Sequence, residues 1–107
     1  MKGLSIDKNK EILTKLINKI ILKRYPELTL DDIRPFAFRG YTIFEVMFLT
    51  SEILPSKVQN KILNDIDDLF IAAGLKYDEN GSPNANSIGV YFKAPGEDEF
   101  TFTNTLY

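Results

Sequence analysis

The chain has no cysteine, no histidine and no tryptophan among its 107 residues. Without cysteine it can form no disulfide, no thiolate nucleophile and no cysteine-ligated metal site. Without histidine it lacks the commonest general base and the commonest metal ligand in proteins. These absences exclude catalysis of the Ser-His-Asp and Cys-His types. We therefore predict a protein that is not an enzyme and that uses no metal or cofactor.

Long hydrophobic runs are also missing. The apolar residues between positions 12 and 22 are interrupted by polar ones, so the N-terminal region lacks the apolar segment of a signal peptide. No stretch approaches the roughly 20 apolar residues that cross a bilayer. We expect a cytoplasmic location and no membrane contact.

The residues that are present have the composition of an ordinary globular protein, with 44% hydrophobic and 26% charged residues. The length suits one domain, and we find no internal repeat, low-complexity tract or linker. We predict that residues 1–107 form a single α+β domain.

The first predicted helix runs from about Asp7 to Tyr25, where apolar residues recur with helical spacing. Ser5 or Asp7 is its expected N-cap. It should end at Tyr25, because the following Pro26 disfavours helical geometry at the residue before it. A single capped turn is predicted for the segment from Thr29 to Asp32.

The second predicted helix runs from about Pro55 or Ser56 to Ala73. The segment Ser56 to Gln59 has the pattern of a capping box. Gly74 is suited to the position after the helix, where a positive φ is common.

A β-hairpin is predicted between the helices, with strands Ile33 to Phe38 and Tyr41 to Thr50. Arg39 and Gly40 would form its two-residue turn. This turn sets a register that places opposite charges across the strands, which independently supports the register and predicts an ion pair there. The paired residues would be Phe38 with Tyr41, Phe36 with Ile43, and Arg34 with Glu45.

Three further strands are predicted at Leu75 to Asp78, Ser87 to Lys93 and Glu99 to Thr105. The element order is then α-β-β-α-β-β-β, with one of the last strands being short. We expect an antiparallel sheet packed against two helices in a two-layer sandwich. The strand order within the sheet is not determined by the sequence.

The strand Tyr41 to Thr50 is apolar on both of its faces, broken mainly by Glu45. A sheet covered on one side should alternate apolar with polar residues. The second face is therefore either covered by the chain itself, buried in a homodimer, or used to bind another protein. The expected protein-binding residues are Phe36, Phe38, Tyr41 and Ile43, rimmed by Arg34, Arg39 and Glu45.

Our leading hypothesis is a non-enzymatic protein-binding regulator, inhibitor or adaptor, of a size that viruses and mobile elements often encode. An alternative rests on the basic N-terminal region. Residues 1–25 hold seven basic and two acidic side chains, a net +5, although the whole chain is at −2. Nucleic acid could bind one basic face of the first helix, formed by Lys8, Lys15, Lys19 and Lys23.

A second alternative is a metal-dependent hydrolase that uses aspartate and glutamate. Asp65, Asp67 and Asp68 lie close together in the second predicted helix. Asp67 points away from Asp65, however, and no glycine-containing loop surrounds them. We interpret these three residues as solvent-facing acids and assign no metal ligand.

Overall fold

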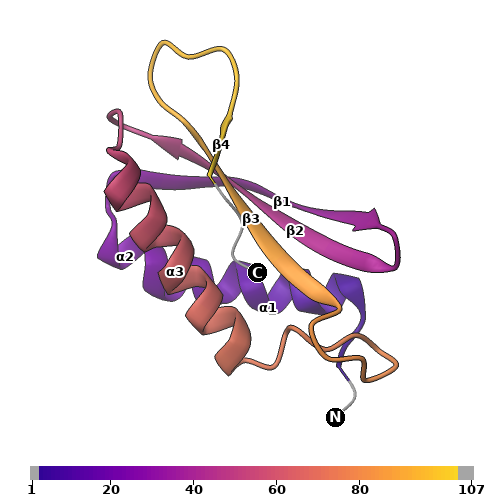
Figure 1. The fold of residues 1–107 in the computed structure, drawn as a ribbon. Coiled ribbons are helices and arrows are strands. Elements are labelled where there is room, and N and C mark those ends of the chain that lie inside the picture. The colour runs from indigo at the N-terminus through magenta and orange to yellow at the C-terminus, as the bar shows by residue number, and fades with distance from the viewer. Residues whose placement is uncertain (1–2, 104–107) are drawn as a thin grey trace.

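The computed structural model describes residues 3–103, and in it two long helices lie on one side of a four-stranded sheet (Figure 1). The α+β class expected from the sequence is confirmed. The elements in chain order are α1 (Ile6–Leu16), η1 (Ile17–Ile21), α2 (Leu22–Arg24), β1 (Leu28–Phe38), β2 (Tyr41–Thr50), α3 (Ser56–Ala72), β3 (Asn86–Lys93) and β4 (Thr101–Thr103).

The first helix is continuous through α1, η1 and α2, and η1 is π-helical. Leu13, Ile17 and Ile21 recur at every fourth position and are fully buried. Four residues of an α-helix advance by one turn plus about 40°, so such a row drifts away from one face. The wider i→i+5 turns of η1 wind less per residue and return the row to the core.

The two ends of this helix agree with the sequence. The Ser5 hydroxyl accepts a hydrogen bond from the Lys8 backbone N–H at 3.2 Å, as expected of an N-cap. The helix stops at Arg24, and Tyr25 donates from its hydroxyl to Asp65 Oδ2 on α3 at 2.5 Å. Arg24 Nη1 lies 3.1 Å from the same oxygen. Burial, followed by the bond to Asp65, raises the pKa of Tyr25 to about 12.

The strand β1 starts earlier than predicted, and the predicted capped turn from Thr29 to Asp32 is wrong. Those residues pair with β2, and the register shifts between Leu30 and Asp32 so that Asp31 forms a bulge. A neighbouring strand supplies backbone partners all along the segment, whereas a local cap supplies only one. Tertiary pairing therefore overrides the local turn signal.

The helix α3 also begins differently, because its N-cap is Pro55 and not Ser56. The predicted capping box is absent, since Ser56 already lies inside the helix. Gln59 instead donates from its side-chain amide to the Leu54 carbonyl at 2.9 Å. The predicted end is confirmed, with Gly74 at φ +73° just beyond the helix.

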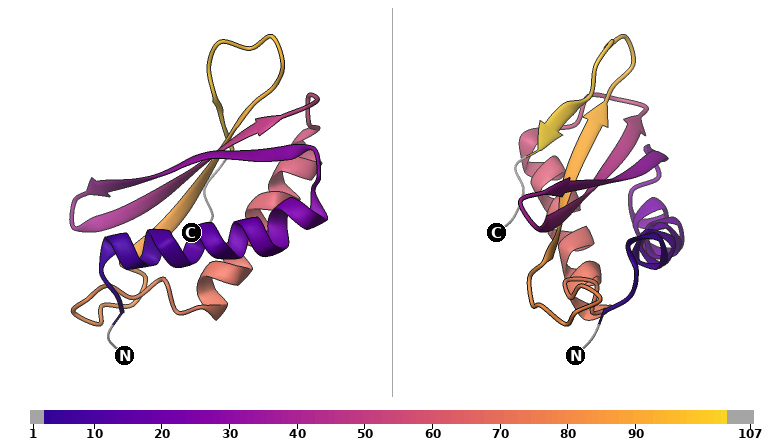
Figure 2. Two further views of the ribbon diagram at one scale, coloured as in Figure 1. Left: turned by 180° about the vertical axis from the view of Figure 1, so that it is seen from behind. Right: turned by 90° about the vertical axis from the view of Figure 1, so that its right-hand side faces the viewer.

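The sheet has the order β1-β2-β3-β4 and is mixed, so the expected purely antiparallel sheet is wrong. The pairs β1–β2 and β3–β4 are antiparallel, whereas β2 and β3 are parallel. Between β2 and β3 the chain returns through α3 to the edge of the sheet where β2 began (Figure 2). This crossover is long enough for β3 to run in the same direction as β2. The sequence pattern alone does not reveal which strands become neighbours.

The core lies between the helices and one face of the sheet (Figure 2). Phe44 of β2 packs against Phe70 of α3, with ring centroids 5.9 Å apart. Phe48 stacks on Phe92 of β3 at 5.8 Å. The same cluster includes Leu13, Ile17, Ile21, Ile62, Leu63, Ile66, Ile88 and Val90.

The predicted strand Leu75 to Asp78 is also wrong, since this segment forms turns and a bend. The side-chain amide of Asn86 donates to the carbonyls of Leu75 and Tyr77, at 2.8 and 3.1 Å. The backbone N–H of Asn86 also donates to the Lys76 carbonyl at 3.1 Å, so this one residue binds three successive carbonyls of the segment. Of the last predicted strand, Glu99 to Thr105, residues 101–103 form β4, and residues 104 and 105 lie outside the described part.

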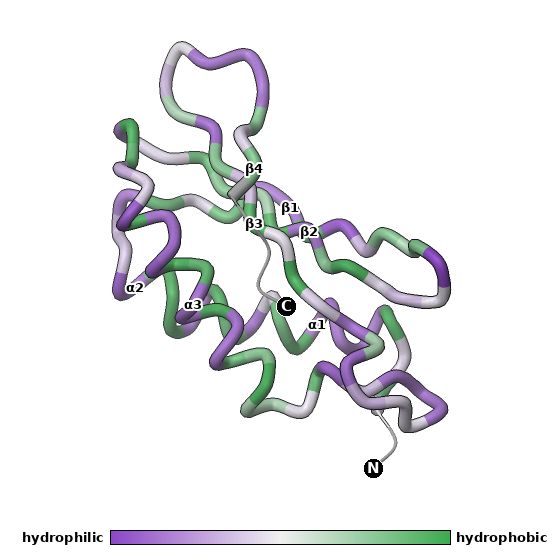
Figure 3. Tube along the Cα trace, in the orientation of Figure 1, coloured by the Kyte–Doolittle hydropathy of each residue, from purple (hydrophilic) through white to green (hydrophobic). Residues whose placement is uncertain are grey.

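Hydropathy follows the arrangement, because the loop between α3 and β3 is hydrophilic while much of β2 is hydrophobic (Figure 3). Within residues 3–103, no helix has both the length and the apolar content that a membrane crossing requires.

Candidate protein-binding face

Four apolar side chains gather on the sheet face that points away from the helices, which we term the open face. We call them the hairpin patch: Phe36, Phe38, Tyr41 and Ile43. The register pairs Phe36 with Ile43 and Phe38 with Tyr41, so all four share one face. Phe36, Phe38 and Tyr41 are 48%, 50% and 58% exposed. Nothing within residues 3–103 covers this end of the second apolar face.

The two phenylalanine rings of the hairpin patch stack on each other because they come from alternate residues of the same strand. Phe36 and Phe38, two residues apart, stack with centroids 6.3 Å apart and an angle of 17° between their planes. The Arg39 guanidinium lies over the Phe38 ring at 5.2 Å from its centroid. The patch is therefore a continuous aromatic surface with a cation at one end.

The predicted turn holds the patch in place. Arg39 and Gly40 have φ values of +50° and +82°, so both central residues are left-handed, as the tightest hairpin turn requires. The predicted register over Arg34 to Glu45 is confirmed. Arginine carries a steric cost in this conformation that glycine and asparagine largely avoid. The protein places a charged side chain at the tip despite that cost.

The predicted ion pair between Arg34 and Glu45 does not form among the described residues, although the two residues are opposite each other. Arg34 Nε donates to Asp32 Oδ2 on its own strand at 3.2 Å. Tyr91 donates from its hydroxyl to Glu45 Oε2 at 2.7 Å. Each of the two charged side chains therefore forms its hydrogen bond with a different neighbour on the open face.

These contacts alter the titration of two groups. The hydrogen bond from Arg34 lowers the pKa of Asp32 below its usual value. Burial, and then the bond to Glu45, raises the pKa of Tyr91 to about 12. Tyr91 therefore stays a neutral hydrogen-bond donor to a higher pH than an ordinary tyrosine.

The end of the open face away from the hairpin tip is partly covered by side chains of the sheet itself. Met47 is buried, and Tyr91 packs on Phe102 of β4 with ring centroids 4.9 Å apart. Leu49 and Phe102 keep part of their surface exposed. The exposed aromatic surface is therefore concentrated at the hairpin tip.

A groove with a volume of about 670 Å³ borders the hairpin patch. We call it the aromatic groove. Its apolar wall comes from the hairpin and its polar wall from the segment leading into β3, because Ser87 lies beside Ile43 in the parallel pair. The lining residues are Phe38, Tyr41, Ile43, Lys76, Asn84, Asn86 and Ser87.

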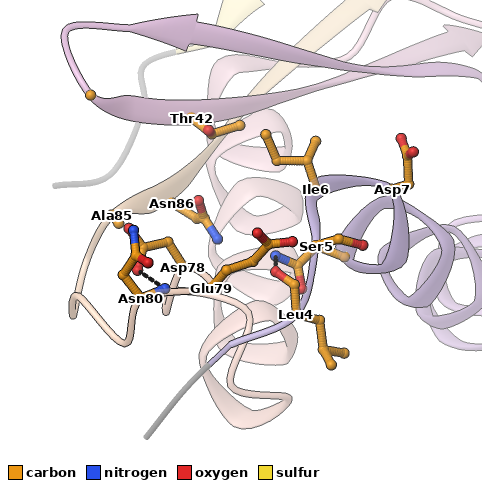
Figure 4. A pocket seen from close by; sticks show the side chains of 12 residues that line it. Leu4, Ser5, Ile6, Asp7, Thr42, Asp78, Glu79, Asn80, Ala85 and Asn86 are labelled. Carbon is orange, nitrogen blue, oxygen red and sulfur yellow. Dashed lines mark hydrogen bonds between the residues drawn. The ribbon is translucent and has the colours of Figure 1, made fainter.

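A second cavity, about 490 Å³, lies on the helix side of the same hairpin. Figure 4 shows it between the start of α1 and the loop before β3, beneath Thr42. Three of its lining residues are acidic, namely Asp7, Asp78 and Glu79, and none is basic. Asp78 Oδ1 accepts from the backbone N–H groups of Asn80 and Ser82, so it also shapes the loop. We call this the acidic cavity.

The free edge of β1 is blunted. The Ile33 N–H donates to the Asp32 side chain at 2.8 Å, so it points away from β2. By the two-residue period of a strand, the Pro35 nitrogen faces the same edge, and proline has no N–H. The bulge at Asp31 twists the edge further. Strand addition at this edge is disfavoured, whereas the face beside it is free.

The basic row on the first helix is partly neutralised. Lys8 and Lys15 both form ion pairs with Glu11, at 3.5 and 3.2 Å. These lysines lower the pKa of Glu11, the bond from Lys15 most. Lys19 and Lys23 are exposed further along the helix. The row is therefore a weaker phosphate-binding surface than the sequence suggests.

The three aspartates of α3 have separate structural surroundings. Asp65 binds Tyr25 and Arg24, and Asp67 lies 3.9 Å from Lys76 Nζ. Burial raises the pKa of Asp67, with Lys76 acting in the opposite direction. Only Asp68 is exposed. Between residues 3 and 103, no group of three or more acidic side chains could hold a metal ion.

Sequence reasoning missed the polar wall of the groove. Lys76, Asn84 and Ser87 adjoin the hairpin only because β3 pairs with β2 in parallel. The one available signal was the polar, asparagine-rich segment from Glu79 to Asn86, a composition typical of binding loops.

No family model, no curated protein and no solved structure matches this chain. Its function has to be inferred from the residues of the candidate site.

Proposed function

We propose that the chain is a non-enzymatic protein-binding module, a regulator, inhibitor or adaptor, that uses the hairpin patch. The single observation that carries this proposal is the exposure of Phe36, Phe38 and Tyr41 together on an uncovered sheet face. Aromatic residues are the side chains most enriched at the energetic centres of interfaces. Keeping three of them half exposed gives the monomer little stability.

The magnitudes indicate how the patch would act. About half of three aromatic side chains corresponds to about 300 Å² of surface. Its burial is worth about 7 kcal/mol before any cost of association. Association itself costs about 4–15 kcal/mol. The patch therefore supplies the central anchors, and further contacts around it must supply the remainder of an interface of about 800 Å² per partner.

The surrounding charges support specificity more than affinity. Arg34 is already paired with Asp32, so a partner can cover that pair without leaving an unpaired charge. Glu45 accepts from the neutral Tyr91 hydroxyl and keeps its charge, so a partner that covers it must supply a cation. Arg39 has no carboxylate partner within residues 3–103. The blunted β1 edge favours contact through the face over strand addition.

The proposal is tested by affinity capture from the cells that make the protein, followed by quantitative mass spectrometry. Tyr41→Asp and Ile43→Asp each place a charge in the hairpin patch and should reduce recovery of a specific partner at least tenfold. Ile71→Asp is the matched control, because Ile71 is 51% exposed on α3. Circular dichroism must first show that all variants are folded. Undiminished capture by folded Tyr41→Asp would refute the site.

A second copy of the chain is one candidate partner. Light scattering over a range of concentrations distinguishes a homodimer from a monomer that binds a foreign protein. If the protein is a dimer and Tyr41→Asp dissociates it, the hairpin patch is still an interface. The proposed function would then be self-assembly and not regulation or adaptation of a foreign protein.

A further inference from the structure

The aromatic groove has two unlike walls. Phe38 and Tyr41 provide an apolar wall that is half exposed, while Asn84 and Ser87 provide hydrogen-bonding groups opposite it. Pockets that bind organic groups combine an apolar lining with a few polar groups in this way. Its volume of about 670 Å³ lies within the range of such pockets, roughly 300–1,000 Å³. The groove can accept a whole side chain of a partner.

The described lining of the groove carries a positive charge. Lys76 is the one charged residue among the lining residues that the structure describes, and its Nζ lies 3.9 Å from Asp67, at the outer limit of an ion pair. Arg39 stands over the outer end of the apolar wall, on the Phe38 ring. Glu45 also lies on the open face, where it accepts a hydrogen bond from Tyr91, but it does not belong to the described lining of the groove. The described lining of the aromatic groove is therefore basic, whereas that of the acidic cavity on the opposite face of β2 is acidic.

We propose that the aromatic groove receives an aromatic or large aliphatic side chain of the partner that stands next to a carboxylate. The ring lies against Phe38 and Tyr41, and the carboxylate lies between Lys76 and Arg39. This inference rests on the proposed function and names the chemistry of the partner's anchor. A partner anchor bearing an amine would lack a carboxylate in the groove to pair with.

The probe is sodium 3-phenylpropionate, which carries one ring and one carboxylate. It is titrated into the ¹⁵N-labelled full chain, and amide shifts are followed by NMR. Three matched compounds separate the parts: 3-phenylpropanamide without the charge, 3-phenylpropylamine with the opposite charge, and acetate without the ring. For so small a ligand we expect a dissociation constant of about a millimolar. The acid should bind about three- to tenfold more tightly than the amide.

Two variants test the assignment of charge. Lys76→Gln is combined with Asp67→Asn, so that no buried carboxylate is left unpaired. In this double variant, and in Arg39→Gln, the preference for the acid over the amide should shrink to less than twofold. Lys57→Gln, an exposed lysine at the start of α3, should leave the preference unchanged.

Several results would overturn the inference: no shifts with 3-phenylpropionate, equal binding of the acid and the amide, tighter binding of the amine, or shifts around the acidic cavity. These outcomes are separable from failure of the proposed function. If Tyr41→Asp still abolishes partner capture while the acid shows no preference, the patch stands and only the anchor chemistry is wrong. If capture is unaffected by Tyr41→Asp, the proposed function fails first.

Discussion

Phe44, Val46 and Phe48 on one face of β2 are fully buried, whereas Tyr41 on its other face is more than half exposed. The two faces differ little in apolar content. Both helices cover the first face, and neither covers the second (Figures 1 and 2). The comparison separates two roles for apolar residues, because one set stabilises the fold and the other is available to a partner.

The largest expected difference lies between Phe44→Ala and Tyr41→Ala. Removing the buried Phe44 ring leaves a cavity against Phe70 and should lower the free energy of unfolding by about 3–5 kcal/mol. Tyr41→Ala removes a mostly exposed ring and should cost less than about 1 kcal/mol. Urea denaturation of both variants measures this contrast. Similar losses for the two would mean that the open face contributes to the stability of the fold.

A second contrast compares tyrosines on the two sides of the sheet. Tyr25→Phe removes a hydrogen bond from a buried tyrosine to the partly buried carboxylate of Asp65 and should cost about 1.5–3 kcal/mol at neutral pH. Tyr91→Phe, on the open face, should cost less than about 1 kcal/mol, because Tyr91 is partly exposed and water can replace it as a donor to Glu45. Chemical denaturation of the two variants checks the order.

The same tyrosines predict a dependence on pH. Their pKa in the folded protein is about 12, above the ordinary value of 10.0. An acid whose pKa is raised by folding stabilises the protein below its unfolded pKa and loses that effect as pH rises. The free energy of unfolding should therefore fall between pH 10 and 12. In Tyr25→Phe the fall should be smaller, and an unchanged profile would contradict the assigned contact.

Arg39→Asn tests why an arginine stands at the tip of the hairpin. Asparagine tolerates the left-handed conformation better than arginine, but the variant also loses the contact of the guanidinium with the Phe38 ring, so the net gain in stability should be below about 0.5 kcal/mol. Arg39→Lys keeps the charge and the strain and should show no such gain. If Arg39→Asn is more stable but captures less partner, the arginine is retained for binding and not for folding. Thermal unfolding with the capture assay measures both.

Pro35→Val produces the smallest expected change in stability, within about 0.5 kcal/mol, because Pro35 is exposed on the edge strand. It restores an N–H to the free edge of β1 and should promote concentration-dependent self-association. Light scattering detects this. Unchanged behaviour would show that Asp32 and the bulge are sufficient to protect the edge.

Local features were predicted well where short-range physics dominates. The glycine after α3, the register of the hairpin and the N-cap of the first helix all depend on residues a few positions apart; the N-cap was predicted as Ser5 or Asp7 and is Ser5. The hairpin residues proposed for binding were selected because both faces of one strand are apolar. The structure leaves three of these aromatic residues half exposed, while the binding role itself stays a proposal.

Predictions failed where long-range pairing competed with local signals. The turn at Thr29 became strand because β2 was available as a neighbour. The segment predicted as a strand at Leu75 forms turns, because its carbonyls accept hydrogen bonds from the side chain of Asn86. The Arg34–Glu45 ion pair did not form because Asp32 and Tyr91 were nearer competitors. In each case the winning partner lies where only the folded chain places it.

The two amphipathic helices, the hairpin and its two-sided hydrophobicity can be predicted from local patterns, because side-chain periodicity and turn chemistry act over a few residues. The parallel pairing of β3 with β2, which places Lys76 and Ser87 beside the aromatic residues of the hairpin, arises from packing over the whole fold. The same packing selects the face of the sheet that the helices cover. That choice depends on how all the apolar surfaces pack together, a property of the whole chain that no local pattern encodes.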